Sequence, residues 1–147
     1  MTARFETDLN IRVIGNRSWM LLDDLVFYSE RYQGHVVAPA GFQTDLASIP
    51  RLVWTIFPKV GLHDKAAVIH DAGYGNALTT YHEDRAQRQR IFTVKRVADD
   101  LFLEGMEAEN VNRLGRWFMW RAVVNFGSPE GHPLAANRHS AEAMTWV

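Results

Sequence analysis

The sequence predicts an α+β fold in which an N-terminal antiparallel β-meander is followed by a half built from three helices. Short apolar segments separated by turn residues fill the first third of the chain, and from Lys65 onward the apolar residues recur at helical spacing. With 147 residues, of which 47% are hydrophobic, the chain can bury one sizeable core. We therefore expect a single domain over residues 1–129 and a C-terminal tail or arm over residues 130–147.

Four apolar segments predict the strands of the meander. Leu9, Ile11 and Val13 alternate with polar residues, and a Gly-Asn turn follows them. Further strands are predicted at 19–22, 25–28 and 35–37. The segment 42–50 is rich in residues that cap helices or turn the chain, so it predicts a structured loop leading into a short helix.

Three stretches of helical periodicity follow. The first helix is predicted from about residue 63 to 74, where glycines and an asparagine supply its stop. The second is predicted from about residue 83 or 85 to 106, with one broad apolar face. The third is predicted over about 109–126, and Gly-Ser-Pro ends it.

Charge and composition exclude several classes of protein and site. Sixteen basic and seventeen acidic residues give no basic excess, so we expect no nucleic-acid partner. The absence of cysteine excludes disulfides, thiolate metal sites and a cysteine nucleophile. The N-terminus lacks the apolar stretch of a signal peptide, and no apolar run approaches the roughly 20 residues that span a bilayer. We expect a soluble protein.

Two polar residues and a tyrosine interrupt the apolar pattern of the first predicted helix. At roughly 100° per residue, His70, Asp71 and Tyr74 fall within a sector of about 100°, so all three can face one space. Imidazole is suited to moving a proton near neutral pH, and a carboxylate can hold a hard cation. The alternative is a structural pair that satisfies its own hydrogen bonds near the helix end.

Asp99 is the expected partner of this histidine, because it borders the apolar face of the second predicted helix. If the first two helices pack antiparallel, Asp99 can approach His70 and fix its tautomer, as a buried carboxylate does for a catalytic imidazole. Tyr74 can donate to the same carboxylate. The other charged residues of this helix are most simply a solvated face: Lys95, Arg96 and Asp100.

Two further groups are candidates for binding. Asp45, with Thr44 and Ser48, either forms a helix-capping turn or contacts a metal or substrate. Trp117 and Trp120 lie on a helix that is apolar around most of its circumference. Such tryptophans either pack in the core or contact a partner.

The string His70-Asp71-x-x-Tyr74, together with Ala98-Asp99-x-x-Phe102, resembles the two-helix core of the phospholipase A2 superfamily, particularly its compact, cysteine-poor viral members. The resemblance implies that His70 activates a water, that Asp71 binds calcium with Asp45 as a further ligand, and that Asp99 orients the histidine. Tyr74 would support them. The superfamily places a glycine-rich calcium loop before the histidine, whereas this chain has residues 44–50 and a lone glycine there.

A wider resemblance covers nearly the whole chain. Its motifs are Pro39-Ala40-Gly41-Phe42, Thr44-Asp45-x-Ala47-Ser48-Ile49-Pro50-Arg51 and Val123-x-x-Phe126-Gly127, besides the His70 and Asp99 strings. They are similar to those of an uncharacterised family common in tailed-phage and prophage genomes. The resemblance implies a phage or prophage origin and a location in the host cytoplasm or the virion.

Taken together, the two resemblances imply a phage-associated, phospholipase A2-like hydrolase. A histidine-activated water would attack an ester, with calcium as cofactor and a phospholipid or membrane surface as partner. Two alternatives stay open: a non-catalytic tail, baseplate or host-protein-binding component, and a hydrolase that acts on the cell wall. The sequence does not indicate an oligomeric state.

Overall fold

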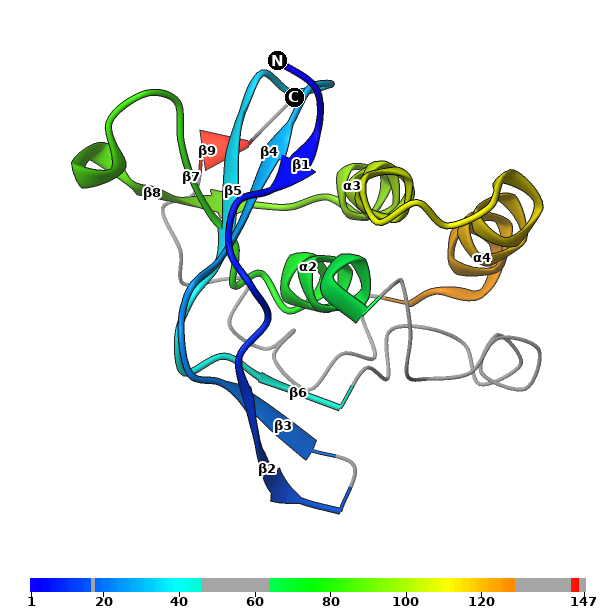
Figure 1. Cartoon of the computed structure of the whole chain (residues 1–147), viewed down its shortest axis with the longest axis horizontal. Helices are drawn as coiled ribbons and strands as arrows, with labels where there is room; N and C mark the ends of the chain where they lie inside the picture. Colours follow the sequence, from blue (N-terminus) through cyan, green and yellow to red (C-terminus); the bar gives the residue numbers. More distant parts are fainter. Residues whose placement is uncertain (17, 46–63, 129–143, 146–147) are drawn as a thin grey trace.

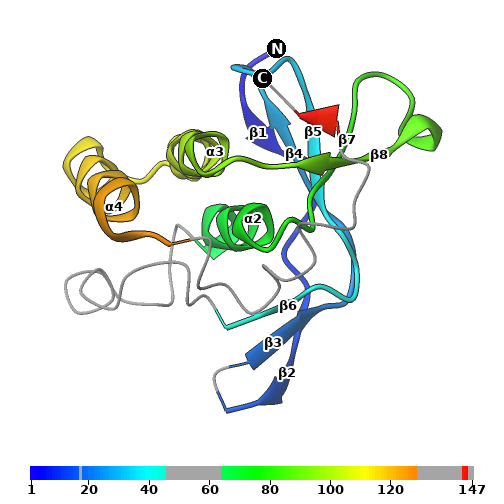
Figure 2. The ribbon, with the colours of Figure 1, turned by 180° about the vertical axis from the view of Figure 1, so that it is seen from behind.

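A computed structural model describes residues 1–16, 18–45, 64–128 and 144–145, and it confirms the α+β class (Figure 1). The larger sheet has the strand order β1-β4-β5-β7-β8-β9, and the smaller has the order β2-β3-β6. The described helices α2, α3 and α4 all lie on one side of the larger sheet (Figures 1 and 2). Helix α4 is the outermost of them.

The N-terminal strands are antiparallel, as predicted, and they divide between the two sheets. In the larger sheet, β4 (Leu25–Ser29) pairs with β5 (Gly34–Ala38) and with β1 (Arg4–Phe5). In the smaller sheet, β3 (Ser18–Leu21) pairs with β2 (Ile11–Gly15) and with β6 (Gln43–Thr44). The chain therefore crosses between the sheets instead of forming one continuous meander.

A hairpin occupies the region where the second helix was predicted to begin. Strand β7 (Thr79–Tyr81) pairs with β5, the short 3-10 helix η1 (Arg85–Gln87) turns the chain, and β8 (Gln89–Phe92) returns antiparallel to β7. The prediction of a helix from residue 83 or 85 is wrong, because Ile91 lies in a strand although it also fits the helical period of the residues after it. A strand of this length is too short to show its own period of two.

None of the three helices is longer than predicted. Helix α2 (Asp64–Tyr74) agrees with the prediction, and α3 (Lys95–Ala108) begins after the hairpin. Helix α4 (Arg113–Phe126) begins later than predicted, because Asn110 has a positive φ of 60° and Asn112 caps the helix through the backbone N–H of Gly115.

Small residues let α2 and α3 approach closely. A Cβ added at Gly73 would lie 2.9 Å from the Cβ of Ala98, and one added at Gly105 would lie 2.9 Å from the Cβ of Ala66. Larger side chains at either glycine would force the helices apart. The close packing sets His70 of α2 against the face of α3 that carries the candidate carboxylate.

Two apolar clusters enclose these helices. The first joins the sheets to α2 and α3 through side chains such as Phe27, Val36, Ile69 and Leu101. The second joins α3 to α4 through side chains such as Phe102, Met106, Met119 and Val123. In the part of the chain that the structure describes, no helix is long and apolar enough to cross a membrane.

Some predictions fall mostly outside the described residues. Of the predicted tail over 130–147, only the two residues of β9 (Met144–Thr145) are described, and they pair in parallel with β8. The short helix predicted after residue 50, the lone Gly61 and the candidate Ser48 lie outside the described residues.

Glu109, at the end of α3, holds the beginning of α2. Its carboxylate accepts hydrogen bonds from the backbone N–H groups of Lys65 at 3.2 Å and Ala66 at 3.1 Å. Burial raises the pKa of Glu109 to about 7, and the neighbouring Asp64 carboxylate acts in the same direction, against the two N–H donors. The charged carboxylate is thus disfavoured in the folded protein.

This raised pKa predicts a pH-dependent stability. Since the folded pKa lies above the ordinary value of 4.5, folding takes up a proton between the two values. The contribution of Glu109 is fully present below pH 4.5 and is lost as the pH rises through about 7. We expect the melting temperature of the wild type, relative to that of Glu109→Gln, to fall between about pH 5 and about pH 8 in thermal melts. A constant difference would contradict this.

Candidate functional site

The carboxylate of Asp99 is the centre of a polar cluster between α2, α3 and α4. Its Oδ1 atom lies 2.8 Å from Nε2 of His70 and accepts a hydrogen bond from the hydroxyl of Tyr74 at 2.6 Å. Its Oδ2 atom accepts a hydrogen bond from Nζ of Lys95 at 2.6 Å. The structure thus brings together the three residues that the sequence assigned to catalysis, and it adds a lysine.

The cluster is buried and charged. His70 and Tyr74 are fully buried, and Asp99 is 3% exposed. Burial alone would raise the pKa of Asp99, but the hydrogen bonds from His70, Lys95 and Tyr74 outweigh it and lower that pKa. Burial and the bond to Asp99 raise the pKa of Tyr74 far above its ordinary value, so its hydroxyl keeps its proton and donates.

The histidine ring is fixed by both packing and hydrogen bonding. Its centroid lies 4.2 Å from that of Tyr74 and 4.9 Å from that of Phe102. Because Asp99 is an anionic acceptor, Nε2 of His70 carries the proton that it shares with that carboxylate. A neutral imidazole in this tautomer has its basic lone pair on Nδ1.

Lys95 is 32% exposed, but its ammonium group does not simply face solvent as predicted. Besides Asp99, its Nζ donates to the backbone carbonyls of Val123 at 2.9 Å and Val124 at 3.0 Å. These carbonyls lie near the C-terminus of α4, where the helix dipole attracts a cation. Lys95 therefore connects the end of α4 to Asp99, and its spacing of four residues from Asp99 was the sequence signal for that contact.

The other two charged residues of that predicted face differ from each other. Asp100 is not simply solvated, because its Oδ2 forms an ion pair with Arg31 at 2.8 Å and accepts from the hydroxyl of Tyr32 at 3.3 Å. Arg96 is exposed, as predicted. Neither residue contacts the cluster through a described bond.

Gly127, which the sequence marked as a helix stop and as part of a family motif, is required by the position of Tyr74. A Cβ at Gly127 would overlap the Tyr74 hydroxyl and the carbonyl oxygen of Val123. Any larger residue would push the tyrosine from Asp99 or would shift the end of α4. The close approach is a second link between α4 and the cluster.

Asp71 and its neighbour His70 bind different partners. The hydroxyl of Thr44 donates to Oδ2 of Asp71 at 2.5 Å, and both side chains are buried. This bond ties β6 to α2. Asp45, which follows Thr44, is exposed.

The described residues do not complete a calcium site. Calcium takes six to eight oxygen ligands, and no group of three or more His, Asp or Glu side chains within the described ranges is arranged to hold a metal. The Asp71 carboxylate accepts a hydrogen bond from Thr44 through Oδ2. Calcium binding by Asp71 and Asp45 stays a prediction.

Thermal melts test that prediction. A ligand that binds only the folded state raises the free energy of unfolding by about 2.7 kcal/mol at a hundred times its dissociation constant. If Asp71 is a ligand, calcium should stabilise the wild type, relative to chelator, and should not stabilise Asp71→Asn. Identical melts across a wide calcium range would contradict the prediction.

The two candidate tryptophans lie in different surroundings. Trp117 is 55% exposed. Trp120 is partly buried against the second apolar cluster, so of the two it is the one that packs in the core. Only Trp117 is placed to meet a partner without a change in the packing of α4.

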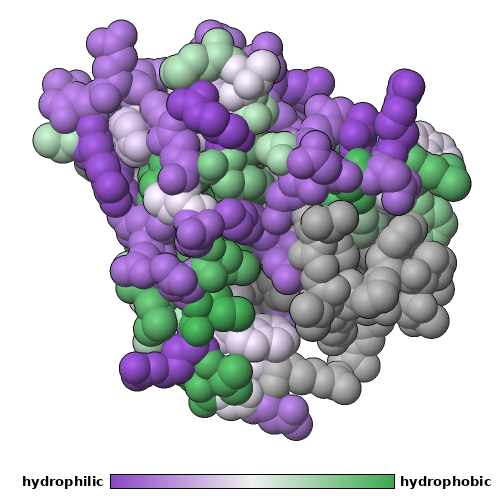
Figure 3. Space-filling model, in the orientation of Figure 1, coloured by the Kyte–Doolittle hydropathy of each residue, from purple (hydrophilic) through white to green (hydrophobic). Residues whose placement is uncertain are grey.

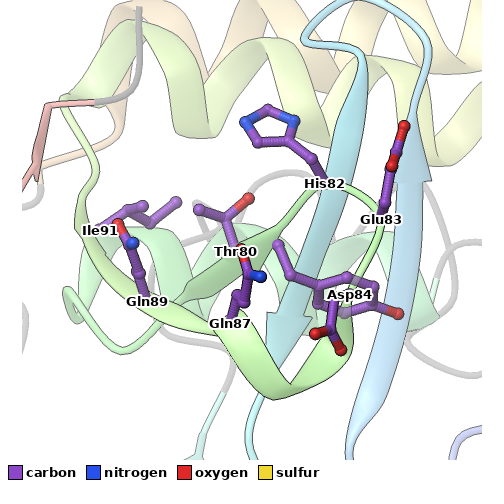
Figure 4. Close-up of a pocket in the computed structure, with 8 residues that line it drawn as sticks. Thr80, His82, Glu83, Asp84, Gln87, Gln89 and Ile91 are labelled. Atoms are coloured by element: carbon purple, nitrogen blue, oxygen red, sulfur yellow. The ribbon is translucent and has the colours of Figure 1, made fainter.

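A hollow of about 390 Å³ lies away from this cluster, on the β7–β8 hairpin (Figure 4). Several of the polar side chains that line it already form hydrogen bonds with backbone groups. Thr80 donates to the carbonyl of His35, Nδ1 of His82 lies 3.2 Å from the carbonyl of Gln33, and Asp84 caps η1. We therefore place the candidate site at the His70 cluster.

Comparison with known proteins gives one match. The family described as "Protein of unknown function (DUF1353)" matches residues 19–123, a segment that includes α2, α3 and most of α4. No curated protein and no solved structure matches the chain. The match therefore includes the whole Asp99 cluster and assigns no activity to it.

Proposed function

We propose that this chain, which belongs to the DUF1353 family of proteins of unknown function, is a hydrolase in which His70 activates a water molecule. The observation that carries the proposal is the 2.8 Å contact between Nε2 of His70 and Oδ1 of a buried, charged Asp99. Perturbed ionisable groups held by specific partners are typical of functional sites. The phage-associated, phospholipase A2-like character implied by the sequence motifs is part of the same proposal.

The proposed reaction uses the two nitrogens of His70 in different ways. Nδ1 takes a proton from water while the water oxygen bonds to the ester carbonyl carbon. The negative carboxylate of Asp99 stabilises the imidazolium that forms, and Tyr74 and Lys95 hold that carboxylate in place. The imidazolium then returns the proton to the alcohol oxygen as the carbon–oxygen bond breaks, which yields an acid and an alcohol.

Release of fatty acid from mixed phospholipid vesicles tests the proposal on the wild-type protein. The assay is run with calcium and with chelator, so that turnover is detected whether or not a metal participates. Turnover that requires His70 supports the proposal. No turnover on any phospholipid, with the protein shown to be folded, would overturn the phospholipid hydrolase.

A second candidate function is a non-catalytic phage component that binds a virion or host partner. The complete burial of His70 and Tyr74 favours it, because a closed polar cluster can serve stability alone. The exposure of Trp117 favours it as well, since tryptophan is enriched where partners bind. In this candidate, the loss of His70 lowers stability and leaves binding through α4 intact.

A further inference from the structure

Helix α4 concentrates positive charge. It carries Arg113, Arg116 and Arg121 and no acidic residue, in a chain whose formal net charge is −1. Arg116 is paired with Glu107 at 3.3 Å. Within the ranges that the structure describes, no ion pair involves Arg113 or Arg121. Two exposed cations of this helix therefore have no described counter-charge.

These two arginines flank exposed apolar side chains. At about 100° per residue, Arg113, Leu114, Trp117 and Arg121 fall within a sector of about 100°, which we call the α4 outer face. Leu114 is 77% exposed and Trp117 is 55% exposed. Both ribbon views place α4 at the outer end of the helical layer, with α3 between it and the larger sheet (Figures 1 and 2).

Figure 3 shows that apolar surface also lies over the β2–β3 hairpin, where Val13 is 69% exposed. Strand β2 is an edge of the smaller sheet, and such edges are open to pairing with other chains. Among its described residues this hairpin carries a single exposed cation, Arg12, whereas the α4 outer face carries two. The α4 outer face differs, because its cations specify an anionic partner.

We propose that the α4 outer face docks on an anionic phospholipid surface. Arginines near a membrane surface attract anionic headgroups, and tryptophan and leucine insert at the boundary between headgroups and acyl chains. The face is a convex helix side rather than a groove, which suits a flat surface. The exposed leucine and tryptophan beside the arginines favour a lipid surface over a nucleic acid, because a lipid surface can take up both apolar side chains. The inference deepens the proposed function, and it rests on that function only for the role of the lipid as substrate.

The same helix reaches the candidate site from its other end. Its C-terminal carbonyls bind Lys95, and Gly127 contacts Tyr74, so α4 bears on the residues that hold Asp99. The helix that would contact the membrane through the α4 outer face is thus the same helix that contacts Lys95 and Tyr74, the residues that hold Asp99.

Vesicle flotation tests the docking surface. The wild type should bind vesicles of phosphatidylglycerol and phosphatidylcholine in equal parts, should bind pure phosphatidylcholine much more weakly, and should lose binding as salt is raised. We expect Arg121→Gln and Arg113→Gln each to weaken binding to the anionic vesicles about fivefold. The matched control is Arg12→Gln, which removes an exposed arginine from β2 and should leave binding unchanged.

The outcomes separate this inference from the proposed hydrolase. Anionic-vesicle binding that survives in His70→Gln supports docking even where no lipid is hydrolysed. Absence of binding by the wild type overturns it, and so does an Arg12→Gln variant that loses as much affinity as Arg121→Gln. Trp117→Ala should bind less than the wild type at high salt, where the charge contribution is screened. Equal binding there would exclude Trp117 from the surface and overturn the assignment.

Discussion

Replacing His70 by glutamine is expected to lower hydrolysis of a phospholipid ester by about a hundredfold to ten-thousandfold while the protein stays folded. The amide nitrogen of glutamine can take the place of Nε2 and can donate to Asp99, so much of the buried bonding is kept. Glutamine has no basic lone pair to replace Nδ1. The proton of the attacking water then has no acceptor on the protein at that position.

Initial rates of fatty acid release and urea denaturation, measured on the same preparations, check this expectation. Tyr74→Phe is the matched control, because it removes another hydrogen bond to Asp99 without removing a base. It should lower the rate far less than His70→Gln does. A His70→Gln variant that keeps wild-type turnover would eliminate the catalytic role. Two results together would favour the non-catalytic binding component: a wild type without turnover, and a His70→Gln variant whose free energy of unfolding is about 1 to 3 kcal/mol lower.

The central contact of the site could be predicted because helical geometry leaves few choices. His70 and Tyr74 lie one turn apart on α2, so a carboxylate at the border of the next helix's apolar face can reach both. Asp99 was selected over Asp100 by its angle to that face. The structure agrees, since Asp100 faces Arg31.

The contacts of Lys95 with α4 could not be predicted from one helix alone. Its aliphatic stem lets the ammonium group reach inward from a half-exposed position, and two of its three partners are carbonyls of α4. Those carbonyls lie near in space and far in sequence. A helical wheel carries no information on them.

The hairpin over residues 79–92 was missed for a similar reason. Strand β7 exists because Thr79, Thr80 and Tyr81 pair with β5, more than forty positions earlier in the chain. Tertiary pairing overrides the local pattern in strands this short. The division of the N-terminal strands between two sheets also depends on pairing that local periodicity does not specify.

Removing the charge of Asp99 is expected to have the largest effect on stability. The carboxylate side chain is 4% exposed and accepts bonds from His70, Tyr74 and Lys95. Breaking one side of a fully buried ion pair costs about 3 to 5 kcal/mol. Because Lys95 is 32% exposed and keeps two carbonyl acceptors, we expect a cost below that range, of about 1 to 3 kcal/mol. Asp99→Asn keeps the size of the side chain, so most of its cost should come from Lys95.

A double-mutant cycle in urea denaturation separates this ion pair from the other bonds. Lys95→Met made in the Asp99→Asn background should cost less than Lys95→Met in the wild type, with a coupling energy of about 0.5 to 3 kcal/mol. If the two effects simply add, the ammonium group does not depend on Asp99, and the carbonyls of Val123 and Val124 are its main partners.

The stabilising contribution of the Asp99 carboxylate depends on pH. Because the hydrogen bonds lower the pKa of Asp99 below its ordinary value of 3.8, its contribution is present above pH 3.8 and is lost as the pH falls through the lowered value. The stability difference between wild type and Asp99→Asn should therefore be constant near neutral pH and should shrink in acid. A difference that grows in acid would mean that the folded protein holds Asp99 in its neutral form, and the imidazolium of His70 would then lack the anion that the proposed reaction requires.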